Sequence, residues 1–128
     1  MQEAPTLTET VELCRRGNFD ADQFALIFWS VRSLLPNASQ DLEEHLGLLL
    51  SHGDRLAAVI LLLPPGWGFS LQRSCNGRSV ASARQVPTSV PQFCEAEDEA
   101  AALLGALATA LLNPTLRIVP RELHDPLR

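Results

Sequence analysis

The chain contains no lysine and no tyrosine, so every basic side chain is an arginine. Its 128 residues include 10 basic and 15 acidic side chains, which give a net charge of -5. An acidic chain lacks the broad positive field that attracts phosphate groups, so general nucleic-acid binding is disfavoured. With 46% hydrophobic residues, the composition belongs to the folded globular class. We expect one domain over residues 1–128, with a core that needs no metal or disulfide.

Long hydrophobic runs, a secretory signal and paired cysteine motifs are also missing. The longest apolar stretches, residues 56–63 and 100–112, are shorter than the roughly 20 residues that cross a bilayer. The first residues, MQEAPTLTET, have neither a basic nor an apolar signal region. Cys14, Cys75 and Cys94 are odd in number and form no CxxC motif. These features predict a cytoplasmic protein with reduced thiols and no membrane contact.

No motif for catalysis, metal binding or cofactor binding is found. His45 and His52 are seven residues apart but lack the further Cys or His ligands of a metal site. The sequence GFSLQ is not the GxSxG of hydrolases, and GWG lacks the residues of a phosphate-binding loop. Cys94 precedes an acidic helix start, where carboxylates oppose thiol activation. We therefore predict no catalytic residue, no metal and no cofactor.

Two capping-box spacings mark helices in the first 53 residues. Thr6 with Glu9 predicts a helix over residues 7–16, and Asp20 with Gln23 predicts a second helix that ends before Pro36. A third helix follows Ser39. We expect these helices to form an N-terminal part that covers the core of residues 54–112. The apolar stripe of the second helix consists of Phe24, Ile27, Phe28, Val31 and Leu35.

The next element, residues 56–63, is apolar on all sides and is predicted as a short buried helix or, alternatively, a strand. After Pro64-Pro65 the apolar residues alternate, and Asn76-Gly77 indicates a hairpin over residues 67–86. A two-residue turn would pair Phe69 with Arg84, Leu71 with Ser82 and Trp67 with Val86. That register would place Gly68, Ser70, Ala81 and Ala83 on one small face, open to close packing by a helix.

A loop with two prolines then leads to an acidic helix start at residues 95–99 and an apolar helix up to residue 112. Residues 116–119 are a candidate third strand, and residues 113–128 form a C-terminal extension. Together these elements predict an α+β fold, in which about five helices pack with a small antiparallel sheet of two to three strands.

Residues 54–112 also resemble a known group of proteins. The pattern DRLAAVILLLPPGWGFSLQR, followed by GRSVASA and an Ala/Leu-rich helix, is similar to small uncharacterised phage and prophage proteins of the ABA-sandwich type. The resemblance implies an α+β sandwich and a phage-like origin, and it implies no catalytic residues. It is carried by the closing helix and by Leu56, Ala57, Ala58, Leu63, Pro64, Gly66 and Trp67.

Two functions from different classes fit the sequence. The first is a non-enzymatic protein–protein interaction module that self-associates, because the apolar helices exceed what one small sheet can cover. Its further partner would be an unidentified host or phage protein. The alternative is a protein that binds or sequesters a nucleotide-like small ligand by ion pairing and stacking. Under either hypothesis the candidate binding residues are Trp67, Phe69, Arg73, Arg78 and Arg84.

Overall fold

The chain folds into five helices and a three-stranded antiparallel sheet, which confirms the predicted α+β class. The computed structural model describes residues 6–16, 20–35, 40–85 and 90–112. None of the helices in these ranges is long and apolar enough to cross a membrane. The helices are α1 (Leu7–Arg16), α2 (Ala21–Arg32), α3 (Gln40–Ser51), α4 (Arg55–Leu62) and α5 (Glu99–Leu112).

Local capping sets the starts of the first two helices, as predicted. At α1, the Thr6 N–H donates to Glu9 Oε1 at 2.9 Å and the Glu9 N–H donates to Thr6 Oγ1 at 3.1 Å. Asp20 and Gln23 make the same reciprocal pair at α2, at 3.2 and 2.9 Å. Each box satisfies backbone donors that a helix start leaves unpaired. Two other predicted boundary residues, Pro36 and Ser39, lie outside the described ranges.

The apolar element after Gly53 is a helix, so the strand alternative is wrong. Gly53 takes a positive φ of 78°, and the Ala57 N–H then donates to Asp54 Oδ1 at 3.3 Å. This cap starts α4, and Leu63 leaves helical geometry just before Pro64. Capping and the proline exit decide between helix and strand here, because the hydrophobic pattern is continuous.

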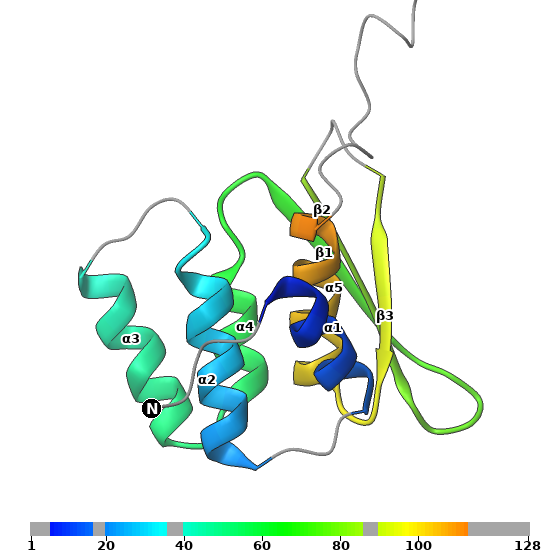
Figure 1. The fold of residues 1–128 in the computed structure, drawn as a ribbon, viewed down its shortest axis with the longest axis horizontal. Helices are drawn as coiled ribbons and strands as arrows, with labels where there is room; N and C mark the ends of the chain where they lie inside the picture. The colour runs from blue at the N-terminus through cyan, green and yellow to red at the C-terminus, as the bar shows by residue number, and fades with distance from the viewer. Residues whose placement is uncertain (1–5, 17–19, 36–39, 86–89, 113–128) are drawn as a thin grey trace, which may run out of the picture.

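The helices and the sheet are stacked in layers (Figure 1). All five helices lie on one side of the sheet, with α1 and α5 next to it. Helix α4 packs on α5, and α3 packs on α4. Helix α5 therefore contacts the sheet, α1 and α4, and its residues 100–108 are all buried. The α2 stripe is also buried and belongs to the same core cluster, so the N-terminal helices and residues 54–112 share one core.

The sheet is a meander of β1 (Trp67–Arg73), β2 (Ser79–Gln85) and β3 (Gln92–Ala96), in the order β1-β2-β3. The predicted hairpin exists, but its predicted register is wrong by one residue. Phe69 pairs with Ala83 and Leu71 pairs with Ala81.

The turn explains this shift. The Ser74 N–H donates to Arg78 O at 2.8 Å and the Gly77 N–H donates to Ser74 O at 3.0 Å. Three residues, Cys75 to Gly77, therefore form the loop, and Gly77 has a positive φ of 87°. A three-residue hairpin loop of this kind needs glycine at its left-handed position. The prediction of a two-residue turn placed the glycine correctly but counted the loop one residue short.

The third strand also differs from the prediction. It is formed by residues 92–96, which we assigned to the loop and the acidic helix start, whereas residues 116–119 lie outside the described part of the chain. Helix α5 starts only at Glu99, where the Ala101 N–H donates to Asp98 Oδ1 at 2.8 Å. The sequence analysis did not predict this strand because its largest apolar residue points away from the core, the reverse of the usual pattern. The small residues Cys94 and Ala96 face the core, while Phe93 is 60% exposed.

Candidate functional site

The two faces of the sheet have different surroundings. Residues of the covered face meet α5, and Ala81, Ala83, Cys94 and Ala96 are each at most 2% exposed. The opposite face carries no helix in the part of the chain that the structure describes (Figure 1). We call it the open face. It consists of Gly68, Ser70, Gln72, Val80, Ser82, Arg84, Phe93 and Glu95.

The open face combines an aromatic group with small polar side chains. Phe93 lies in the central row, opposite Ser82, which in turn pairs with Ser70. The hydroxyl groups of the two serines are 2.6 Å apart and hydrogen-bond each other across the strands. An open hollow of about 420 Å³ lies beside this row. It is lined by Gly68, Phe69, Ser70, Ser82, Arg84 and Pro91.

The structure does not bring the five predicted binding residues together. Trp67 and Phe69 pair with residues of the covered face, and Trp67 packs against the core. Arg84 lies on the open face, where it pairs with Gly68. Arg73 is turned back to the hairpin loop, where Nη1 donates to Gly77 O at 2.9 Å. Trp67 and Arg84 therefore lie on opposite faces of the sheet. A small ligand that stacks on Trp67 would not lie on the face that carries Arg84.

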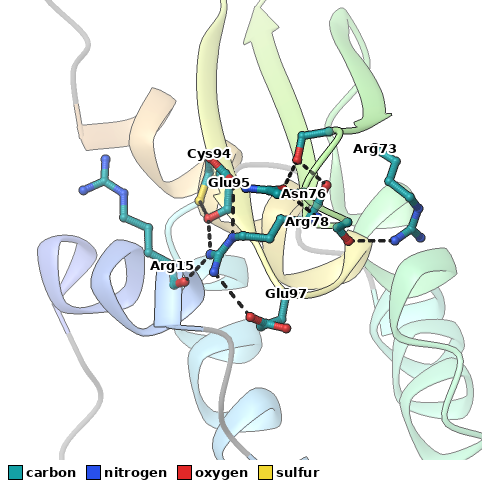
Figure 2. A network of polar contacts seen from close by, with 9 residues as sticks. Arg15, Arg73, Asn76, Arg78, Cys94, Glu95 and Glu97 are labelled. Carbon is teal, nitrogen blue, oxygen red and sulfur yellow. Dashed lines mark hydrogen bonds and ion pairs between the residues drawn. The ribbon is translucent and has the colours of Figure 1, made fainter.

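Arg78 is held by contacts within the chain (Figure 2). Its Nε lies 3.2 Å from Glu95 Oε2, and its Nη1 donates to Glu97 Oε2 at 3.3 Å. Its Nη2 donates to the carbonyl oxygen of Arg15 at 2.9 Å. Carbonyls near a helix C-terminus lack helical partners and attract cations. Arg78 thus joins the hairpin, the end of β3 and the C-terminus of α1, which is a structural role that the sequence did not reveal.

Two of the three cysteines belong to the core. Burial raises the pKa of both the Cys14 and the Cys94 thiol, and the arginines near Cys94 offset this only in part. These thiols stay protonated, so neither is an activated nucleophile. Cys75 is free and exposed in the hairpin loop.

Gly105 of α5 lies directly against both buried cysteines. A Cβ atom at this position would be 2.5 Å from Cys94 Sγ and 2.9 Å from Cys14 Cβ. Helix α5 can approach β3 and α1 this closely only because the position has no side chain. The buried thiols and the glycine therefore form a tight packing contact between three elements, α1, β3 and α5.

Phe93 and its neighbours are the surface residues that the sequence analysis missed. The signal was the alternation in QFCEA, where the small residues Cys94 and Ala96 alternate with the larger Phe93 and Glu95. Fold and surface together define a small α+β protein that presents a one-sided sheet on a helical core. No protein-family model, curated protein or solved structure matches the chain.

Proposed function

We propose that the protein is a non-enzymatic interaction module that self-associates and presents the open face of its sheet to a second, different protein. The observation that carries the proposal is the uncovered face with Phe93, a residue of the edge strand β3 that is 60% exposed and lies in the middle row of the face. An aromatic side chain ringed by polar groups is typical of the central residue of a protein interface.

The composition of the open face supports a protein partner. Gly68, Ser70 and Ser82 are small, so another chain can approach the backbone closely around Phe93. Among the residues that form the open face, Arg84 is the cation and Glu95 the anion, and Glu95 is itself paired with Arg78, so no strong charge of either sign accumulates there. This balance favours a protein surface over a polyanion.

The biological setting is part of the same proposal. The resemblance of residues 54–112 to phage and prophage proteins supports an accessory role in a phage or prophage, with a host or phage protein as partner. Cys14, Cys75 and Cys94 are all free, which supports a reducing compartment and hence the cytoplasm.

Sedimentation equilibrium of the full chain between about 1 and 100 μM tests self-association, a range suited to weak and moderate dimers. We expect the average mass to rise with concentration toward twice the 14.0 kDa of one chain. A mass that stays at 14.0 kDa throughout this range contradicts self-association.

Co-purification tests the open face. Proteins from a host lysate that bind the tagged chain should be lost with Phe93→Lys, and they should be retained with Leu48→Lys. Leu48 is a suitable control because its exposure, 59%, matches that of Phe93 but it lies on α3. Equal retention by the two variants contradicts a role for the open face.

A further inference from the structure

Strand β1 has an unpaired edge. Within the described residues β1 pairs only with β2, so its other side is available to another strand. The hydrogen bond from the Ser74 N–H to Arg78 O fixes the alternation of the ladder. The backbone groups of Ser70 and Gln72 point toward β2, whereas those of Phe69 and Leu71 point outward. The outward N–H of Trp67 already donates to Pro64 O at 3.2 Å, and the outward groups of the following residues offer donors and acceptors to another strand.

The two edges of the sheet are protected to different degrees. The β3 edge is shorter, begins after Pro91 and carries Glu95, and α1 packs beside it. Prolines, charges and covering helices are the features by which proteins prevent edge pairing. Strand β1 also follows prolines, but within its seven residues it has no proline and no charge before Arg73 at its end, and Phe69 at its edge is 42% exposed. Of the two edges, β1 is the one suited to strand addition.

We infer that self-association occurs by antiparallel pairing of β1 with β1 of a second copy, about a two-fold axis at Ser70, which joins the two sheets into one of six strands. This inference rests on the proposed self-association and specifies its surface. In an antiparallel pair, the backbone groups of two opposite residues both point toward the partner strand or both point away from it, so self-pairing can be centred on residue 69, 70 or 71. Only the register centred on Ser70 pairs all seven residues.

The side chains of β1 complement one another in this register. Phe69 lies beside Leu71 of the second copy, and Trp67 lies beside Arg73 of the second copy. The first pair buries apolar surface that one chain leaves exposed, and the second places a guanidinium next to an indole ring. Each pair occurs twice because the axis relates the two strands.

A cysteine cross-link tests the register. Around the axis Ser70 meets its own copy in a non-hydrogen-bonded pair, with Cα atoms about 4.5 Å apart, which suits a disulfide. In a Cys75→Ser background, oxidised glutathione should convert Ser70→Cys to a covalent dimer, forming one disulfide and two reduced glutathione molecules per dimer. The matched control is Gln72→Cys, whose copies would lie about 13 Å apart along the strands. It should stay monomeric on a non-reducing gel.

Cross-linking from position 72 that equals or exceeds that from position 70 overturns the inference, and so does the absence of any cross-link from position 70. Cys75 must be removed because its exposed thiol would form dimers on its own.

A second pair of variants separates this inference from the proposed function. Phe69→Lys places a charge at the β1 edge and should leave the chain monomeric at 100 μM, while Phe93→Lys makes the same change on the open face and should leave the dimer mass unchanged. Dissociation by Phe93→Lys alone overturns edge pairing but retains self-association. A wild-type chain that is monomeric at all concentrations overturns both.

Discussion

On β2 and β3, the covered and open faces of the sheet differ in the size of their side chains more than in their hydrophobicity, whereas β1 places Trp67, Phe69 and Leu71 on the covered face. Alanine, serine and cysteine are buried on the covered face, and the largest apolar group of β3, Phe93, lies on the open face. The helix above explains this inversion. Helix α5 is rich in alanine and has Gly105 at its contact with β3, so at this contact it lies too close to the sheet for a bulky residue to fit between them. The close approach of α5 thus restricts β3 to small side chains at this contact. The bulky aromatic side chain of Phe93 lies on the open face instead.

The largest expected effect comes from removing side-chain volume in the buried core. Leu104 is fully buried in α5. Leu104→Ala should lower the free energy of unfolding by about 2 to 5 kcal/mol, because the lost apolar contacts leave a cavity. Urea denaturation measures the change.

The matched change on the open face is Phe93→Ala. Since that side chain is 60% exposed, the loss should stay within about 0.5 kcal/mol. The loss should be measured at low protein concentration, where only the single chain contributes. Similar losses for Leu104→Ala and Phe93→Ala would remove the distinction between the buried core and the open face.

A smaller effect is expected when a methyl group is added at the contact between α5 and β3. Gly105→Ala would force Cys94 and Cys14 apart, at a cost of about 1 to 3 kcal/mol for overpacking. The higher helix propensity of alanine offsets this loss in the free energy of unfolding by up to about 1 kcal/mol. We expect a net destabilisation, measured by urea denaturation.

Gly47→Ala is the control for this prediction. Gly47 lies in α3, and a Cβ there meets no atom within 4 Å. The same substitution should stabilise the chain by about 0.5 to 1 kcal/mol, because only helix propensity changes. Stabilisation by both substitutions would contradict the tight packing contact between Gly105 of α5 and Cys94 of β3.

The smallest predicted effect concerns the arginines of the hairpin. Arg78→Ala removes two ion pairs and the hydrogen bond to Arg15, and it should cost about 0.5 to 1 kcal/mol because the group is partly exposed. The loss should shrink at 1 M NaCl, where ion pairs are screened. Arg84→Ala on the open face should cost less than about 0.5 kcal/mol. Denaturation in low and high salt compares them, and equal losses would contradict the structural role of Arg78.

Much of the fold could be predicted from local signals. The α+β class, the bounds of α1, both capping boxes and the buried stripe of α2 follow from side chains a few residues apart. Such interactions form within one or two turns of chain, so the sequence order contains them directly.

The sequence by itself determined where α1 and α2 start, where Gly77 turns the chain, and which helix, α5, is apolar on every side. Only the tertiary structure decided the register of the hairpin, the strand at residues 92–96 and the position of Phe93 on an open face. Each of these depends on partners distant in the chain. Cys94 faces Gly105 of α5, so its neighbour Phe93 points to the open face. Arg78 contacts Arg15 at the end of α1, 63 residues earlier in the sequence. Local pattern cannot encode such contacts, because they depend on how layers pack.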